Sequence, residues 1–150
     1  MSEKLYFRHN FATTVVSKKR VPLSFIRVTT DSFTQHKYLI EQSIKLLNSE
    51  MSWDDMWDID AAEARLERGE TLYLLCENEN PLGHVWYDLY YLYNAYVSTK
   101  RQDGDSVWFI QETMWDMKSE YDLTYIKLYV DDWNDRAKKF WKKLGYLLLN

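Results

Sequence analysis

Alternating apolar and polar residues in the first part of the chain predict a strand followed by a helix. Residues 23–29 alternate with the period of two that is typical of a half-buried strand. Ser32 and Gln35 then stand three positions apart, as in a capping box, in which two side chains satisfy the first free backbone groups of a helix. The helix should run over about 32–48, because its apolar residues recur at helical spacing. These residues are Leu39, Ile40, Ile44 and Leu47.

The middle of the chain predicts a second helix and then a series of strands. Asp60 and Glu63 repeat the capping-box spacing, and Gly69 is a typical residue just past the end of a helix. Three strand-like runs follow, at residues 71–77, 82–89 and 90–97. Asn and Pro between the first two runs favour a turn, because Asn tolerates left-handed dihedral angles and Pro presets its own. We therefore expect an antiparallel hairpin that a third strand extends.

The last third of the chain predicts a helix, a strand and another helix. From Ser106 to about Lys118 an apolar stripe recurs at helical spacing, and its members are Val107, Ile110, Met114 and Met117. Residues 126–130 then alternate as a strand with one buried face. Asn134 is a good N-cap for the last helix, and Gly145 is a good residue after its end. The whole order is typical of an α+β fold with a mixed, mostly antiparallel sheet flanked by helices.

The length of the chain sets the expected domain organisation. A chain of 150 residues fits one domain with its own core, so we expect a single domain over 1–150. Its core would be 22–150, and 1–21 would be an N-terminal extension. Within this extension, Leu5–Phe7 and Thr13–Val15 have the alternation of two short strands and predict a hairpin.

Composition and charge exclude several classes of function. With 46% hydrophobic and 28% charged residues, four Gly and two Pro, the chain should fold by itself. A net charge of −4 argues against nucleic acid as the main partner, because neutralising phosphates needs clustered Lys and Arg. One cysteine, Cys76, and three scattered histidines provide neither a disulfide framework nor zinc-ligand spacing, so we expect no metal. No stretch has the length of a membrane span or the apolar core of a signal peptide, and we expect a cytoplasmic protein.

Residues 130–146 carry the most specific pattern of the chain. The string joins the end of a strand to a short capped helix and a glycine stop. Its fixed positions are Val130, Asn134, Ala137, Phe140, Trp141, Gly145 and Tyr146. The string resembles the last helix of the GNAT superfamily of acyl-CoA-dependent N-acyltransferases, whose pattern is V-x-x-x-N-x-x-A-x-x-F-Y-x-x-x-G-F. The expected order of strands and helices is also similar to that of the GNAT fold, over roughly residues 22–146.

A second stretch, residues 101–106, reads Arg-Gln-Asp-Gly-Asp-Ser and resembles the pyrophosphate loop of the same family, Q/R-x-x-G-x-G/A. A glycine turn before a helix presents unpaired backbone N–H groups and the positive end of the helix dipole to an anion. An ordinary turn between a strand and a helix is the alternative interpretation of the motif alone. Its place between a strand and an amphipathic helix, 30 residues before Asn134, favours the phosphate loop.

The resemblance implies an N-acetyltransferase that moves an acetyl group from acetyl-CoA to a primary amine by direct attack. The thioester would lie in a gap between the strands at 90–97 and 123–130. Backbone N–H groups near the end of the earlier strand would polarise its carbonyl. The residues implied in binding the coenzyme are Tyr96, Val97, Arg101, Gln102, Asp103, Gly104, Asp105, Ser106, Asn134 and Trp141.

Three positions depart from the family pattern in a way that affects the chemistry. Asp103 and Asp105 place carboxylates in the phosphate loop, and each costs on the order of 1–4 kcal/mol beside a phosphate unless it points to water. Trp141 replaces a tyrosine that in the family often protonates the departing thiolate, and an indole N–H is not an acid near neutral pH. The tyrosines that could take its place are Tyr96, Tyr129 and Tyr146.

The sequence also offers candidates for the base and for the acceptor pocket. An alkylamine with a pKa of about 10.4 is mostly protonated at pH 7, so attack needs a base, for which Asp88 and His84 are candidates on the strand before. The alternative is a structural role for each: Asp88 would be a solvated turn residue, and His84 a hydrogen-bonded strand residue. The segment between the first two helices suits a cationic amine, such as a polyamine, a lysine side chain or a protein N-terminus. Its aromatic and acidic residues include Trp53, Asp54, Asp55 and Trp57, which could also cap and pack against the second helix.

Two alternatives to an active enzyme stay open on the sequence alone. A GNAT-fold protein that binds acyl-CoA or a protein partner without turnover is favoured by Trp141 and the acidic loop, whereas an aromatic-rich interaction protein would bind no coenzyme.

The end of the chain raises a separate question, because 146–150 supply at most one strand where the family usually has two. We hypothesise that the N-terminal 20 residues, or a partner subunit in a homodimer, complete the sheet there, since an uncovered edge is a liability.

Overall fold

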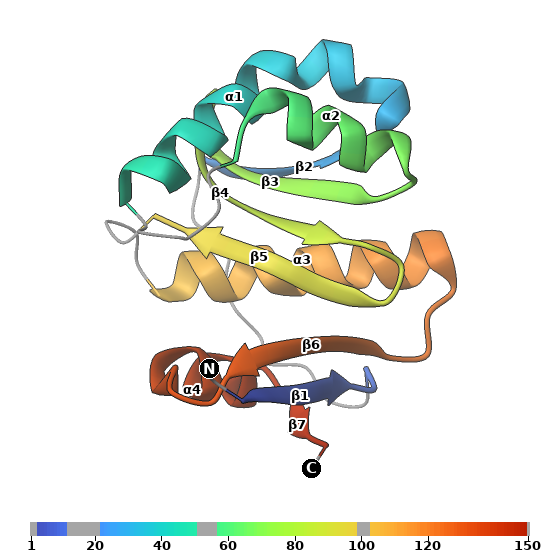
Figure 1. The fold of residues 1–150 in the computed structure, drawn as a ribbon, viewed down its shortest axis with the longest axis vertical. Helices are drawn as coiled ribbons and strands as arrows, with labels where there is room; N and C mark the ends of the chain where they lie inside the picture. Colours follow the sequence, from blue (N-terminus) through green and yellow to red (C-terminus); the bar gives the residue numbers. More distant parts are fainter. Residues whose placement is uncertain (1–2, 12–21, 51–56, 99–102, 150) are drawn as a thin grey trace.

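The described residues form one sheet with helices on both of its faces (Figure 1). A computed structural model describes residues 3–11, 22–50, 57–98 and 103–149. The strands are β1 (Lys4–His9), β2 (Leu23–Val28), β3 (Thr71–Glu77), β4 (Asn80–Tyr87), β5 (Tyr91–Val97), β6 (Ile126–Asp131) and β7 (Leu147–Leu148). The helices are α1 (Phe33–Glu50), α2 (Ile59–Glu67), α3 (Asp103–Tyr121) and α4 (Asp135–Lys143), with a 3-10 turn, η1 (Thr30–Ser32), before α1.

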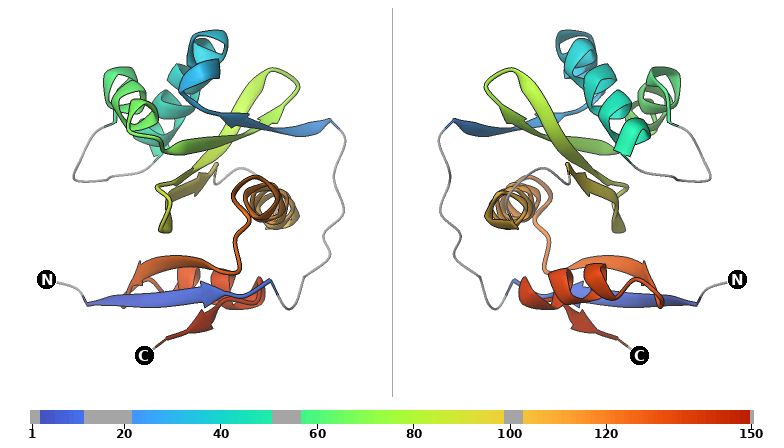
Figure 2. Two further views of the ribbon diagram at one scale, coloured as in Figure 1. Left: turned by 90° about the vertical axis from the view of Figure 1, so that its right-hand side faces the viewer. Right: turned by 90° about the vertical axis from the view of Figure 1, so that its left-hand side faces the viewer.

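The sheet is mixed and mostly antiparallel. Within the described ranges its seven strands follow the order β2-β3-β4-β5-β6-β1-β7. Neighbouring strands are antiparallel except β5 and β6, which run parallel. The helices α1 and α2 pack on one face, and α3 and α4 pack on the other (Figure 2). The α+β fold class that the sequence predicts is confirmed.

Strand β3, the second in the sheet order, is buried on both faces. Leu72 and Leu74 pack toward α1 and α2, whereas Tyr73 and Leu75 pack toward α3. Successive side chains of a strand point to opposite faces, so a strand covered on both faces is apolar at nearly every position. The two clusters of buried residues therefore meet at β3 and hold the two layers of helices to one sheet.

The N-terminal strand completes the sheet at the C-terminal side. β1 pairs with β6 along its whole length, beginning with Lys4 opposite Asp131, and its other edge pairs with β7. The hypothesis that the first 20 residues complete this end is thus confirmed for residues 4–9. The second strand of the expected hairpin, Thr13–Val15, lies outside the described residues.

Two helix starts differ from the predicted caps. Before α1, the hydroxyl of Ser32 accepts from the backbone N–H of Thr29 over 3.1 Å, so the capping pair is Thr29 and Ser32. The N-cap of α2 is Asp58, whose Oδ1 accepts from the N–H of Ala61 over 2.8 Å, and not Asp60. Several Thr, Ser and Asp residues stand close together at both starts, and their side chains are nearly equal as caps.

The last helix follows the prediction closely. Asn134 Oδ1 accepts from the backbone N–H of Ala137 over 3.1 Å and caps α4. Gly145, just past the helix, has a φ of +96°, a value that glycine adopts without strain. Between these two local signals, Trp141 lies on the buried side of α4, with 7% of its surface exposed.

Candidate functional site

β5 and β6 open a cleft near the middle of the sheet. The two strands pair at Tyr91 with Lys127 and at Leu92 with Leu128, and beyond these pairs they diverge. The cavity between them has a volume of about 870 Å³, within the usual range for small-ligand sites. Its walls come from α2, β5, β6 and α4, and so from both faces of the sheet. The strands therefore part where the sequence analysis expects a gap.

A bulge in β5 lies beside this opening. Asn94 has a φ of +50°, and the register between β4 and β5 shifts between His84 and Trp86. Asn is one of the few residue types other than Gly that adopt a positive φ readily. The bulge brings two successive side chains, Tyr93 and Asn94, to the face covered by α1 and α2, where each has hydrogen-bond partners. Because a bulge interrupts the ladder, it also marks the point where β5 turns away from β6.

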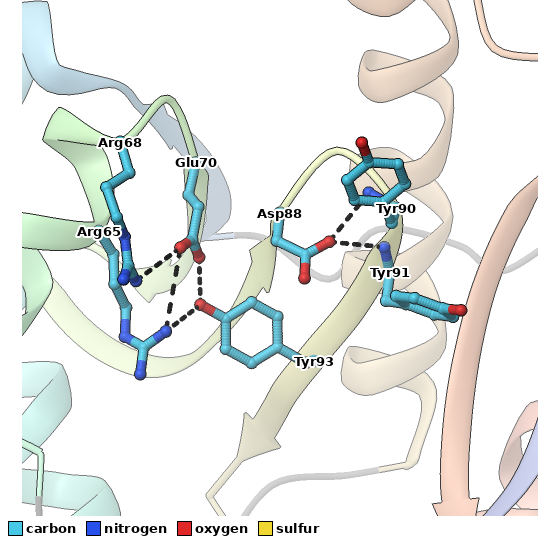
Figure 3. A network of polar contacts seen from close by, with 7 residues as sticks. All are labelled: Arg65, Arg68, Glu70, Asp88, Tyr90, Tyr91 and Tyr93. Atoms are coloured by element: carbon cyan, nitrogen blue, oxygen red, sulfur yellow. Dashed lines mark hydrogen bonds and ion pairs between the residues drawn. The ribbon is translucent and has the colours of Figure 1, made fainter.

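Two arginines and a carboxylate line the cleft on the α2 side (Figure 3). Arg68 Nη2 lies 3.0 Å from Glu70 Oε2, and Arg65 Nη1 lies 3.9 Å from the same oxygen. The hydroxyl of Tyr93 accepts from Arg65 Nη1 over 2.9 Å and donates to Glu70 Oε1. Burial and the Glu70 carboxylate raise the pKa of Tyr93, so this hydroxyl stays protonated. The Arg65 guanidinium also lies over the ring of Trp57, 4.4 Å from its centre.

Asp88 lies in the turn after β4, one residue beyond the strand on which the sequence analysis places it. Its Oδ1 accepts from the backbone N–H of Tyr90 over 2.9 Å and from that of Tyr91 over 2.7 Å. These bonds shape the turn into β5 and fix the carboxylate at the wall of the cleft (Figure 3). Asp88 is therefore a turn residue and also an acidic group of the cleft.

His84 is buried behind the cleft, with 3% of its surface exposed, and it is not one of the residues that line the cavity. Its Nε2 lies 2.8 Å from Asn94 Oδ1, and its Nδ1 lies 2.7 Å from Ser43 Oγ. An amide oxygen only accepts, so Nε2 carries the proton and Nδ1 accepts from the Ser43 hydroxyl. Burial lowers the pKa of His84 to about 4, although its bond to Asn94 acts in the opposite direction. The imidazole is a neutral link between α1 and the bulge.

The opposite wall of the cleft comes from α4. Asn134, Ala137 and Trp141 line it there. Trp141 packs edge-on against Tyr146, with ring centres 5.2 Å apart, so its indole is held from behind. Two residues that the resemblance implies in coenzyme binding, Asn134 and Trp141, thus share one cavity with the bulge at Asn94.

Of the three tyrosines considered as an acid, Tyr129 lines the cavity, and Tyr96 and Tyr146 do not. The hydroxyl of Tyr96 donates to Glu50 Oε1 over 2.5 Å at the end of α1, and the Ser98 hydroxyl donates to the other oxygen over 2.9 Å. Tyr146 has 1% of its surface exposed. Burial raises the pKa of both Tyr96 and Tyr146, which makes each a weaker acid than a solvated tyrosine.

The part of β5 that faces the cavity lies before the residues expected from the sequence. Residues 91–95 line it, whereas Tyr96 and Val97 do not. Val97 pairs with Gly83 of β4, where an added Cβ would lie 2.3 Å from the Tyr96 carbonyl oxygen. The end of β5 is therefore packed tightly on β4. The sequence signal that points to the earlier position is an Asn inside a strand, at Asn94.

The predicted phosphate loop lies at the start of α3, which begins three residues earlier than expected. Asp103–Ser106 form its first turn, while Arg101 and Gln102 lie outside the described residues. Gly104 is exposed, and among the described residues no heavy atom outside its own helix turn lies within 4 Å of the position that a Cβ would take. Asp105 is buried, with 3% of its surface exposed, so the condition under which its carboxylate would cost nothing beside a phosphate, pointing to water, is not met.

The acceptor-side candidates are placed only in part. Trp53, Asp54 and Asp55 lie outside the described residues. Trp57 lines the cleft and stacks on Trp86, with ring centres 5.6 Å apart. Polar and aromatic side chains that no sequence motif indicated also line the cavity, namely Arg65, Arg68, Glu70, Tyr91, Tyr93 and Asn94. They come from different elements, and the arginines have the ordinary sequence context of an exposed helix end.

Comparisons with known proteins identify the fold. No family model and no curated protein matches the chain by sequence. Among solved structures, an aminoglycoside acetyltransferase from an uncultured soil sample, in complex with sisomicin, superposes with a TM-score of 0.60 at 18% identity, over 81% of this chain and 86% of its own. A ribosomal-protein-alanine N-acetyltransferase from Brucella melitensis has a TM-score of 0.56 at 16% identity, over 81% and 89%. A tandem GNAT protein from the clavulanic acid pathway has a TM-score of 0.62 at 9% identity, over 98% and 50%.

The chain has a GNAT-like fold. Its structural neighbours include two acetyltransferases and a tandem GNAT protein by name, and the resemblance noted in residues 130–146 agrees with them. The chain spans about half the length of the tandem protein, and 48% of a Drosophila protein that it matches with a TM-score of 0.70 at 10% identity.

Two features are absent from the described part of the chain. No helix there combines the length and the apolar character that a membrane crossing requires. Nor do His, Cys, Asp and Glu side chains in these ranges come together in groups of three that could hold a metal ion.

Proposed function

We propose that this chain is an N-acetyltransferase that moves an acetyl group from acetyl-CoA to a primary amine. The observation that carries the proposal is the parting of β5 and β6 beyond Leu92, beside the bulge at Asn94. A parallel pair that stayed hydrogen-bonded would close this space. The GNAT-like fold supports the same reaction, because its neighbours include N-acetyltransferases by name.

The cleft suits a thioester whose coenzyme approaches from the α3 side. α3 follows β5, and the positive end of its helix dipole favours a diphosphate. The backbone around Asn94 lines the cavity at the bulge. Amide N–H groups fixed there would stabilise the negative charge that grows on the carbonyl oxygen. Asn134 and Trp141 would contact the coenzyme from the α4 wall.

The reaction needs no covalent enzyme intermediate. The amine nitrogen attacks the carbonyl carbon, so a C–N bond forms while the C–S bond to coenzyme A breaks. The amine loses a proton, and the thiolate leaves. A thiol with a pKa of about 8.5 is a tolerable leaving group as the thiolate, so a missing general acid costs about 10²-fold and not the whole rate.

Asp88 is our proposed base. Its Oδ1 takes two backbone N–H bonds, and among the described contacts Oδ2 has no bond and can accept the amine proton directly or through a water. Glu70, the other carboxylate of this wall, is bound by Arg65, Arg68 and Tyr93 and would lose those contacts by accepting a proton. His84 does not reach the cavity. Tyr129, which lines it, is the proposed acid for the thiolate.

Calorimetric titration with acetyl-CoA, followed by a thiol-release assay over a panel of primary amines, tests the proposal. We expect binding, and release of free coenzyme A only when an amine is present. The Asp88→Asn variant keeps the two N–H bonds to Oδ1 and loses the base, so its rate should fall about 10²–10⁴-fold with unchanged acetyl-CoA affinity. A chain that does not bind acetyl-CoA would disprove the proposal.

A second function, acyl-CoA binding without turnover, is favoured by the presence of Trp141 in the cleft. An indole replaces the ionisable phenol that the family places there, and it fills that part of the wall without supplying an acid. In this case the titration would show binding, and no amine of the panel would release a thiol.

A further inference from the structure

Three tyrosines from three neighbouring strands meet at the mouth of the cleft. The rings of Tyr6 in β1, Tyr91 in β5 and Tyr129 in β6 lie 6.0–6.1 Å apart, centre to centre, in each of the three pairs. Tyr6 and Tyr129 are large aromatic side chains with 39% and 41% of their surfaces exposed. We call this group the tyrosine shelf. Its outermost member comes from the N-terminal strand, which lies outside the family resemblance.

The shelf lies on a sheet face that the described helices leave uncovered. In the register of β1 and β6, Tyr6 stands opposite Tyr129, so both point to the same side. Phe7 and Leu128, the next pair, point to the other side and join the core under α3 and α4. On the shelf side, α1 and α2 lie over β2, β3 and β4, away from β6 and β1 (Figures 1 and 2).

The charge of this face is opposite in sign to that of the whole chain. Lys4 Nζ lies 4.3 Å from the ring centre of Tyr129, and Arg8 and Lys127 both lie over the ring of a neighbouring tyrosine. Asp131, which pairs with Lys4, is the acidic member of these cross-strand pairs. Three positive charges against one negative charge give +2 on this face, in a chain whose net charge is −4. The face is complementary to an acidic, partly apolar partner.

The shelf is continuous with the cleft but extends beyond it. Tyr91 and Tyr129 line the cavity, and Tyr6 does not. Neighbouring strands are about 4.8 Å apart, so β1 lies roughly 10 Å from β5 across β6. An extended peptide rises about 3.3 Å per residue, so about three residues reach from the cleft to Tyr6. A small amine held in the cleft would not touch Tyr6.

We propose that the tyrosine shelf binds an acidic peptide acceptor, whose N-terminal amine enters the cleft while its next residues lie across Tyr129 and Tyr6. The inference rests on the proposed function and names its acceptor class. Rigid aromatic faces hold the peptide, and Lys4, Arg8 and Lys127 select carboxylates among its first residues.

Matched acceptors test the inference. The thiol-release assay compares three compounds: alaninamide, a tetrapeptide with Asp and Glu after an N-terminal Ala, and the same peptide with Lys at those positions. We expect the acidic peptide to have a kcat/KM at least about tenfold above that of the basic one. The Tyr6→Thr variant should lower kcat/KM about tenfold for the acidic peptide, through KM, and leave kcat/KM for alaninamide unchanged.

Tyr38→Thr is the control, because Tyr38 is an exposed tyrosine, at 69%, on α1. This variant should leave kcat/KM unchanged for all three acceptors. If alaninamide is turned over but the acidic peptide has no advantage, or if Tyr6→Thr behaves as Tyr38→Thr does, the shelf does not bind the acceptor and the inference is wrong, although the proposed function stands.

A binding measurement keeps the inference testable without turnover. Calorimetry of the acidic peptide with the full chain, with coenzyme A present, should show binding that Tyr6→Thr weakens about tenfold. Equal binding to both proteins would overturn the inference. Displacement of the peptide by a short single-stranded oligonucleotide of higher affinity would also overturn it, because the face would then bind polyanions in general.

Discussion

Asn94 accepts a hydrogen bond from His84, with 2.8 Å between the amide oxygen and Nε2, and this contact ties the bulge of β5 to the buried side of β4. The other ring nitrogen of His84 accepts from Ser43 in α1. The irregular backbone at the cleft is thus supported by a polar link that runs through the core to a helix. Such a link is costly to break, because each buried group that loses its partner costs about 1–3 kcal/mol.

The first prediction concerns pH. The pKa of His84 is about 4 in the folded protein, whereas a solvated imidazole, as in the unfolded chain, has a pKa of 6.5. Below pH 6.5, His84 is protonated in the unfolded chain but stays neutral in the folded chain. The free energy of unfolding should therefore fall as the pH drops toward 4. The slope should approach about 1.4 kcal/mol per pH unit within this window and vanish above it.

Urea unfolding between pH 7.5 and 4.5, compared with the His84→Gln variant, measures this slope. Gln keeps a donor toward Asn94 but does not titrate. The variant should therefore lose the part of the pH dependence of unfolding free energy that comes from His84, and keep the part that comes from the carboxylates. His36→Gln, on α1, is the control and should follow the unaltered chain. Identical pH profiles for His84→Gln and the unaltered chain would contradict the burial of a neutral imidazole.

The second prediction separates the backbone of Asn94 from its side chain. Asn94→Gly preserves the positive φ of +50° but removes the acceptor for His84. The variant should lose about 1–3 kcal/mol of stability in urea unfolding, because a buried N–H is left without a partner. Asn78→Gly is the matched control, since Asn78 has a φ of +57° in an exposed turn, and it should change stability by less than about 0.5 kcal/mol.

The third prediction addresses the phosphate loop. None of the described residues places a heavy atom within 4 Å of the Cβ position of Gly104, so Gly104→Tyr should leave the midpoint of thermal unfolding within a few degrees of that of the unaltered chain. If acetyl-CoA lies over the first turn of α3, the added side chain occupies its space, and affinity should fall at least about tenfold by calorimetry. Unchanged affinity would remove the phosphate-loop assignment.

The fourth prediction concerns the wall of α4. Trp141→Tyr introduces a phenol at the position where the family pattern has one, inside the cleft. If proton transfer to the thiolate limits the rate, kcat should rise, by up to about 10²-fold, with little change in acetyl-CoA affinity. Trp133→Tyr, at a 67% exposed position outside the cavity, should change neither quantity. A fall in kcat for Trp141→Tyr would mean that the indole itself orients the thioester.

The elements that local signals define were predictable from the sequence. The N-cap at Asn134 and the glycine after α4 act within one turn of the chain, so the amino-acid sequence alone indicates them. The caps of α1 and α2 were misplaced, because neighbouring Thr, Ser and Asp residues compete on nearly equal terms. The start of α3 was placed three residues late for a similar reason, since polar residues at Asp103–Ser106 suit either a loop or a first helical turn.

The candidate site was predictable only where one segment carries it. Asn134 and Trp141 are close in sequence and project from one helix into the cleft, as the motif implies. The α2 side of the cavity depends on contacts between Arg65, Glu70 and Tyr93, which bring together α2, the residue before β3, and β5. No periodicity in the chain indicates that these three side chains meet.

The sequence by itself determined the strands, the helices and the resemblance at residues 130–146, because propensity, capping and periodicity act over a few neighbouring residues. The tertiary structure decided which strands pair. It placed β1 between β6 and β7, with Lys4 opposite Asp131, and it let β5 and β6 separate beyond Leu92. Strand pairing depends on long-range packing and backbone hydrogen bonds, and a strand's own residues specify its faces but not its neighbour.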